Sequence, residues 1–282
     1  MKKFLEKIKK IFVPEAIVTN VGTTVVPPKP LMPYIVIGFL IVFLLAVEVT
    51  NFSLITLISR TFNFRYGPFA IFKRFFPIDW SYTPYVIEPM LETIQMSFLG
   101  SLIGSVLALP AAYLASQNLT SNKLIVGFVR IILSVLRTLP ILIYAVFFKL
   151  IFYPGALPGT IAIALFTFSI VSKMLYERIE VLDLGAYHAI QSSGASKIKA
   201  FITALLPQIY PIFYSIGLYA FEINIRYAAI LGYVGAGGIG FILDNAMKNL
   251  NNNTRTIVIL LFIFVTVIII ENLSRFLRRR LG

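Results

Sequence analysis

The sequence predicts an all-α protein that crosses a lipid bilayer six times, and three observations lead to this fold class. First, 58% of the 282 residues are hydrophobic and only 13% are charged, with a mean hydropathy of +0.87, which is far too apolar for a water-soluble globule. Second, long runs such as 34–47 and 257–270 carry no charge and approach the roughly 20 apolar residues with which a helix crosses a bilayer. Third, the basic residues gather near the two ends.

Apolar runs separated by polar breaks locate the spans in chain order, near residues 33–50, 88–116, 124–151, 157–178, 207–232 and 255–273. An even number of crossings leaves both ends of the chain on the same side of the membrane. Basic residues precede the first span and follow the last one, which predicts that this side is the cytoplasmic side of a cell membrane. These residues are Lys2, Lys3, Lys7, Lys9, Lys10, Arg275, Arg278, Arg279 and Arg280.

This topology divides the chain into five parts. They are a cytoplasmic amino-terminal segment (1–32), the first span (33–50), an external segment (51–87), a core of five spans (88–273) and a basic cytoplasmic tail (274–282). The core includes a cytoplasmic loop at 179–206. The net charge of +13 could indicate nucleic-acid binding. Because the cations flank the spans, they indicate the lipid bilayer as partner and no nucleic acid.

Several kinds of chemistry are disfavoured by the residues that the chain lacks. It has no cysteine and a single histidine, His188, so we expect no metal site. No Gly-x-x-x-x-Gly-Lys-Ser/Thr motif occurs, so the chain does not carry its own P-loop ATPase. A membrane hydrolase is the main enzymatic alternative, but His188 has no Gly-x-Ser-x-Gly motif nearby, and we expect no catalytic residues.

Residues 235–240 match the spacing of the dinucleotide-binding fingerprint, yet their surroundings argue against that function. The fingerprint requires a strand that leads into a helix and an acidic residue about twenty positions later, whereas an apolar span precedes this stretch and another follows it. Glycines at this density in a membrane protein instead allow backbones to approach closely. We therefore expect a helix bend or close packing at Gly235, Gly237, Gly238 and Gly240.

The loop at 179–206 is the longest polar interruption between spans, and it contains a patterned motif. His188, Ala189 and Ile190 are followed after three residues by Gly194 and, after nine more, by Ala-Leu-Leu-Pro at 204–207. This pattern resembles the cytoplasmic coupling motif of ABC importer permeases, which reads Glu-Ala-Ala, three residues, Gly, nine residues, Ile-x-Leu-Pro. The matching positions are Ala189, Gly194, Leu206 and Pro207, and the departures are His188, Ile190 and Ala204.

A loop of this kind suits contact with a soluble partner. Two short helices that meet at a flexible glycine form a compact knob, which can enter a groove on an ATPase subunit and pass motion to the next span. The alternative is an amphipathic surface helix without a partner. The residues expected to couple to the ATPase are His188, Ala189, Ser193, Gly194, Ala195, Leu206 and Pro207.

Further motifs resemble those of the phosphonate ABC transporter permease family. The resemblance implies a type I ABC importer permease fold, a dimer of such subunits, cytoplasmic ATPase subunits that bind ATP and Mg²⁺, and an external substrate-binding protein. It implies no cofactor in this chain, and phosphonate or a related phosphorus oxyanion as substrate. A permease for another small solute, such as an amino acid, and an ATP-independent carrier are the alternatives. The motifs lie at 92–96, 136–140, 183–185, 193–196, 221–226 and 234–240.

Charged and polar residues within the predicted spans are candidates for the translocation pathway, because ionisable groups in a bilayer are costly and usually face protein or water. Glu222 and Arg226 are four residues apart, so on a helix they share one face and can pair. The pair either hides both charges from lipid or lines the pathway, where Arg226 suits a phosphorus oxyanion. Asn224 lies on the same span, and Arg137 is assigned equally to packing and to the pathway.

Overall fold

The computed structural model describes residues 17–18, 22, 24–25, 31–50, 53–62, 73, 76–248 and 253–281. The chain divides into two compact units, residues 1–71 and 72–282. The first unit contains a two-residue antiparallel pairing of β1 (Ile17–Val18) with β2 (Thr24–Val25), followed by α2 (Met32–Val49) and α3 (Leu54–Thr61). None of the side chains of α2 is buried, so this helix presents an apolar surface in every direction, as a helix surrounded by lipid does.

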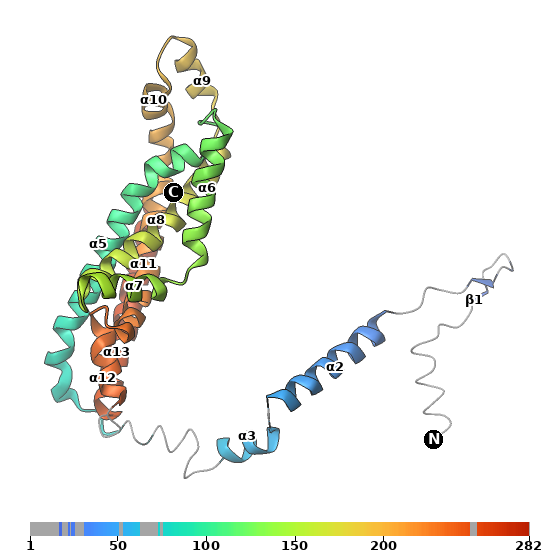
Figure 1. The fold of residues 1–282 in the computed structure, drawn as a ribbon, viewed down its shortest axis with the longest axis vertical. Coiled ribbons are helices and arrows are strands. Elements are labelled where there is room, and N and C mark those ends of the chain that lie inside the picture. The colour runs from blue at the N-terminus through green and yellow to red at the C-terminus, as the bar shows by residue number, and fades with distance from the viewer. Residues whose placement is uncertain are drawn as a thin grey trace. The chain divides into compact units, whose positions relative to one another are not determined.

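Within its described residues the second unit is built from helices alone, and it contains the remaining membrane spans (Figure 1). Its elements confirm the all-α fold class. In chain order they are η1 (Trp80–Tyr82), α5 (Thr83–Ala115), α6 (Lys123–Thr138), α7 (Ile141–Phe152), α8 (Ala156–Glu180), α9 (Gly185–Ser192), α10 (Lys197–Ala200), the π-helical turn η2 (Phe201–Leu205), α11 (Leu206–Leu231), η3 (Gly232–Val234), α12 (Ile239–Lys248) and α13 (Asn253–Leu281).

The centre of this core is the contact between α5 and α8, the most extensive pairing of helices in the structure. Gly100 and Gly104 of α5 face α8 across it, and a Cβ atom added at Gly104 would lie 2.4 Å from the carbonyl oxygen of Ala164. Small residues spaced by four let membrane helices approach to backbone contact. This Gly-x-x-x-Gly spacing, visible in the sequence, explains why these two helices pack so closely.

The third predicted span, 124–151, is interrupted. It consists of α6 and α7, which are inclined by 89° to one another at the break between Thr138 and Ile141. Pro140 precedes α7 as its N-cap residue, and a proline there has no amide hydrogen to donate to the preceding turn. Among the described residues five helices are long and apolar enough to span a bilayer, and the number becomes six when this bent pair is one span.

Two other boundaries differ from those expected from the sequence. The second span begins at Thr83 and not near residue 88. The last helix, α13, continues to Leu281, so residues 274–281, expected as a tail, are further turns of that helix. The stretch between the last two predicted spans also contains a helix of its own, α12, which packs against α13. Hydropathy locates apolar runs, but helices extend beyond them wherever capping and packing allow.

Candidate functional site

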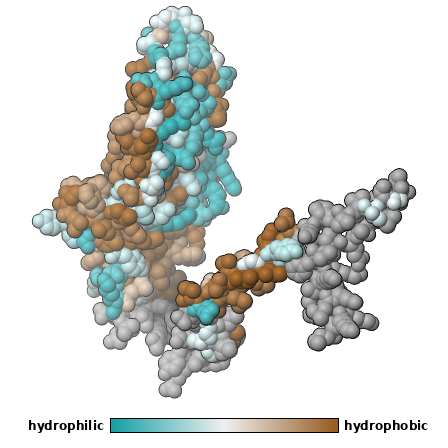
Figure 2. All heavy atoms as spheres, turned by 45° about the vertical axis from the view of Figure 1, so that its right-hand side comes forward, coloured by the Kyte–Doolittle hydropathy of each residue, from teal (hydrophilic) through white to brown (hydrophobic). Residues whose placement is uncertain are grey.

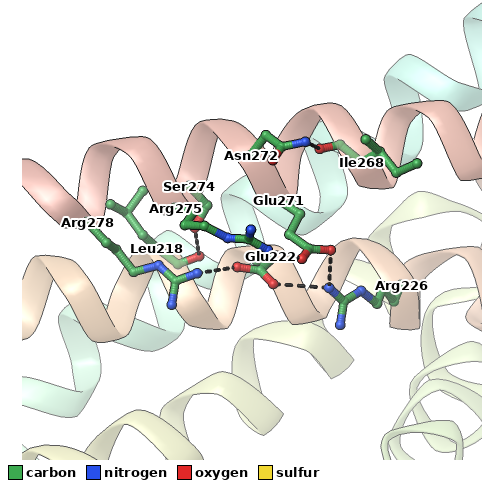
Figure 3. A network of polar contacts seen from close by, with 9 residues as sticks. All are labelled: Leu218, Glu222, Arg226, Ile268, Glu271, Asn272, Ser274, Arg275 and Arg278. Atoms are coloured by element: carbon green, nitrogen blue, oxygen red, sulfur yellow. Dashed lines mark hydrogen bonds and ion pairs between the residues drawn. The ribbon is translucent and has the colours of Figure 1, made fainter.

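A network of five charged side chains joins α11 to α13, with Glu222 buried and the other four side chains partly exposed (Figure 3). Glu222 accepts hydrogen bonds from Arg226 at 3.0 Å and from Arg278 at 2.6 Å. Glu271 accepts from Arg226 at 3.2 Å and from Arg275 at 2.5 Å. Each carboxylate is therefore held by two guanidinium groups, and three cations against two anions leave one net positive charge.

The pairing of Glu222 with Arg226, expected from their spacing, is present in this network. Their exposure differs greatly, since 9% of the Glu222 side chain and 46% of the Arg226 side chain are accessible. Glu222 is thus a buried anion compensated from both sides, whereas Arg226 presents donors outward. A guanidinium exposed on a spanning helix must face water or another protein surface, because hydrocarbon does not solvate it.

Two partners in the network were not expected from the sequence. Glu271 and Arg278 lie on α13, 45 and 56 residues away along the chain from the α11 residues that they contact. Arg278 was assigned from the sequence only to the basic end of the chain. The four-residue spacing of Glu271 and Arg275 was a signal for a pair on one helical face, but it gave no indication of α11.

Asn224 lies on a different face of α11 and belongs to a second polar cluster. Its side chain is 1% exposed, and its amide donates to Ser101 of α5 and to Thr167 of α8, both at 2.7 Å. The Ser97 hydroxyl donates to the Asn224 carbonyl oxygen at 3.4 Å. Asn224 therefore ties three helices together and is not in contact with the charged network.

Replacing Asn224 by alanine should lower the thermal stability of the purified protein. The change removes two interhelical hydrogen bonds and opens space among buried groups, at a cost of about 1–3 kcal/mol. Asn272→Ala is the matched control, because the exposed Asn272 amide bonds only to the carbonyl of Ile268 in its own helix. Equal melting temperatures for the two variants would contradict this structural role.

Arg137, the remaining pathway candidate, lies at the end of α6 beside the bend. Its guanidinium donates to the carbonyl oxygen of Ser169 on α8, at the outer limit of 3.5 Å. No described contact joins Arg137 to Glu222, Arg226 or Asn224. The four candidates thus fall into three separate environments.

The glycine-rich stretch forms the turn between α11 and α12, and it packs on α5. Glu92 accepts a hydrogen bond from the Gly238 amide at 3.0 Å, and the Thr93 hydroxyl accepts one from the Ile239 amide at 2.7 Å. Ile239 is the first residue of α12 and Gly238 directly precedes it, so two adjacent side chains of α5 cap the start of that helix. Three glycines of this stretch have a left-handed backbone conformation, with φ of 81° at Gly235, 76° at Gly237 and 70° at Gly238.

The loop expected to couple to a partner forms the tip of the core, where α9 and α10 lie (Figure 1). Figure 2 shows pale and teal surface at this tip and brown, hydrophobic surface over much of the core below it. His188, Ala189, Ser193 and Gly194 are exposed. Tyr187, by contrast, is 2% exposed and anchors α9 to the core, and burial raises the pKa of its hydroxyl.

The backbone at this tip is fixed by local hydrogen bonds. Gly194, between α9 and α10, has a φ of 94°, and its amide donates to the Gln191 carbonyl at 2.9 Å. The other residues of the motif flank this turn or follow it: Ala195 precedes α10, Leu206 begins α11, and Pro207 lies in the first turn of α11. The π-helical turn η2 connects the tip directly to α11, which carries Glu222 and Arg226.

Comparisons with known proteins give one family match and several relatives. The model of the family "binding-protein-dependent transport system inner membrane component" matches residues 100–282. The chain is 36% identical over 172 residues to the phosphite transport system permease protein PtxC of Stutzerimonas stutzeri, covering 61% of this chain and 62% of that protein. It is 34% identical over 160 residues to the phosphate-import permease protein PhnE of Mycolicibacterium smegmatis, covering 57% of this chain and 30% of that protein.

The matched part is therefore less than two thirds of the length of either relative. Among solved structures, the MetNI methionine ABC transporter in an inward-facing conformation superposes with a TM-score of 0.64 at 19% identity, covering 73% of this chain and all of that one. At this identity the likeness concerns the fold alone. Together with the family match over residues 100–282, it confirms the expected type I ABC importer permease fold of the core.

Proposed function

Because the chain belongs to the family of binding-protein-dependent transport system inner membrane components, we propose that it is the membrane permease subunit of an ATP-driven importer. The substrate class that we propose is phosphonate or a related phosphorus oxyanion, such as phosphite or phosphate. The relatives PtxC and PhnE, described as phosphite and phosphate permeases, support this class. ATP and Mg²⁺ then belong to a partner ATPase, and an external binding protein delivers the anion.

The observation that carries the proposal is the Arg226 guanidinium, which is 46% exposed on a spanning helix and is held by two carboxylates. A planar guanidinium fork matches the oxygens of a phosphorus oxyanion. Two carboxylates reduce the strength with which it holds such an anion, which suits a pathway where cargo must leave as well as enter. A second copy of the chain, facing this surface, would enclose the pathway in a dimer.

The direction of the helices supports a topology with the coupling loop and the carboxyl terminus on the cytoplasmic side. Arg255 near the start of α13 pairs with Asp79, just before α5, at 3.4 Å. Arg278 near the end of α13 reaches α11, the helix that follows the coupling loop. The end of α13 therefore points toward the end of the core that carries α9 and α10, which supports a topology with its arginines and the coupling loop on the same side.

The test is transport by the complete complex. The permease, its ATPase and its binding protein are reconstituted in liposomes, and ATP-dependent uptake is measured for phosphonate, phosphite, phosphate and, as a different class, methionine. Uptake of a phosphorus oxyanion without methionine uptake is the expected result. Uptake of methionine alone, or uptake that does not depend on ATP, would overturn the proposal.

Within that assay, Gly194→Val should uncouple ATP hydrolysis from transport while the core stays folded. An added Cβ meets no atom within 4 Å, but φ is 94°, a conformation that a β-branched residue adopts only with strain of about 1–3 kcal/mol. Gly194→Asn is the matched variant, because asparagine tolerates positive φ better than valine. Substrate-stimulated ATPase activity should fall strongly with valine and less with asparagine, and wild-type activity of the valine variant would refute the coupling role.

A further inference from the structure

A pocket lined by both polar and apolar side chains lies between α8, α11 and α13, beside the charged network and toward the end of the core where α9 and α10 lie. Its volume is about 450 Å³, and its polar lining consists of Arg178, Arg278, Ser215 and Tyr219. Ser215, Tyr219, Glu222 and Arg226 follow one another at spacings of four, three and four residues, so they share one face of α11. The pocket therefore continues the line of the network along that face.

The two arginines in this pocket have donors that the protein does not use. Among the described residues, Arg178 forms no ion pair, and the adjacent acidic residue Glu177 is turned to Lys173 at 3.7 Å. Arg278 uses one terminal nitrogen for Glu222, while its buried Nε has no hydrogen-bond partner. Figure 3 shows the other terminal nitrogen of Arg278 turned away from Glu222.

The chemistry of the pocket selects the ligand. Arg178 has no ion pair among the described residues, and Arg278 shares its charge with Glu222 at 2.6 Å, so the pocket carries a net positive charge that attracts an anion. Guanidinium forks pair bidentately with phosphoryl oxygens. The hydroxyl groups of Ser215 and Tyr219 add two neutral donors. The apolar part of the lining, which includes Ile212 and Met174, lowers the local dielectric and strengthens these interactions.

We infer that this pocket is a binding site for a tetrahedral phosphorus oxyanion, with Arg178 and Arg278 as its cationic ligands. Two sources share this chemistry: the transported anion on its way to the cytoplasm, and the phosphate of a lipid headgroup. The assignment of the bound anion to the transported substrate rests on the proposed function, whereas the anion site itself is inferred from the residues that line the pocket. An anion bound there competes with Glu222 for Arg278, which links occupancy of the pocket to the Glu222–Arg226 pair.

The test measures binding of radiolabelled inorganic phosphate to the purified full-length chain in a maltoside detergent, by equilibrium dialysis. Arg178→Gln should weaken saturable phosphate binding by about tenfold to a hundredfold, the loss of one charge-assisted interaction. Ser215→Ala should weaken it less. Arg279→Gln removes the same charge from the exposed surface of α13, outside the pocket, and should change binding by no more than about twofold.

A competition with phosphatidylglycerol separates the two sources. If the lipid displaces phosphate from the wild type, and if Arg178→Gln also binds the lipid more weakly, the site belongs to a lipid headgroup. Retention of phosphate in excess lipid, together with slower uptake by the Arg178→Gln complex, assigns it to cargo. No saturable binding to the wild type, or equal binding to Arg178→Gln, overturns the site.

The outcome is distinguishable from failure of the transport proposal. A complex that imports phosphorus oxyanions but shows no phosphate binding at Arg178 contradicts this inference alone. A chain that binds phosphate through Arg178 but supports no ATP-dependent import contradicts the transport proposal alone.

Discussion

Replacing Gly240 by valine should prevent the core from reaching its native packing. A Cβ atom at Gly240 would lie 2.0 Å from the carbonyl oxygen of Ala229 and 2.9 Å from the Cα atom of Gly232. Both are backbone atoms, which cannot turn aside as a side chain does, so α12 would have to separate from α11. We expect a loss of stability at or above the upper end of the typical overpacking cost of about 1–3 kcal/mol, measured as aggregation in gel filtration and a lower melting temperature.

Gly127→Ala is the control for this experiment. Gly127 lies in α6, and a Cβ there meets no atom within 4 Å, so alanine should be neutral or should stabilise the helix by up to about 1 kcal/mol. Gly240→Ala tests the same contact with the smallest side chain, and it should already lower the melting temperature. A monodisperse Gly240→Val protein with the wild-type melting temperature would show that the contact between α11 and α12 is not as close as described.

Glu222→Gln should destabilise the protein more than Arg226→Gln does. The neutral amide leaves Arg278, whose buried Nε has no hydrogen-bond partner, without a carboxylate. Because 27% of the Arg278 side chain is accessible, we expect a cost of about 1–3 kcal/mol, below the cost of about 3–5 kcal/mol for a fully buried unpaired charge. Arg226→Gln leaves Glu222 paired with Arg278 and Glu271 paired with Arg275. The measurement is the melting temperature of each purified variant, followed by uptake in reconstituted complexes.

For transport we expect the opposite order, with the larger loss of uptake in Arg226→Gln. Arg226→Gln should assemble normally and yet reduce uptake strongly, because the exposed guanidinium is lost while the Glu222–Arg278 and Glu271–Arg275 pairs remain. The double variant Glu222→Gln/Arg226→Gln should not regain full stability, since Arg278 still lacks a carboxylate. Glu177→Gln, which neutralises an exposed pair with Lys173, serves as the control and should cost no more than about 1 kcal/mol.

Two results would contradict this account of the network. Wild-type stability of Glu222→Gln would mean that Arg278 does not depend on Glu222. Wild-type uptake by a well-folded Arg226→Gln complex would mean that Arg226 only supports packing, and the pathway assignment would be wrong.

The sequence by itself determined the features that depend on local composition and on helical spacing. Apolar content over a bilayer-length window is additive along the chain, so the all-helical membrane fold and the approximate positions of its spans could be predicted. The pairing of Glu222 with Arg226 could also be predicted locally, because residues four apart lie on the same face of any α-helix.

Only the tertiary structure decided which distant residues meet. The bend of 89° between α6 and α7, the cap that Glu92 provides for α12 and the direction of Asn224 into the core depend on where other helices lie. Glu271 and Arg278 join the network from 45 and 56 residues away, a separation that no periodicity encodes. Spacing along one helix specifies a face, and the helix against which that face packs is set by the shape and burial of the whole core.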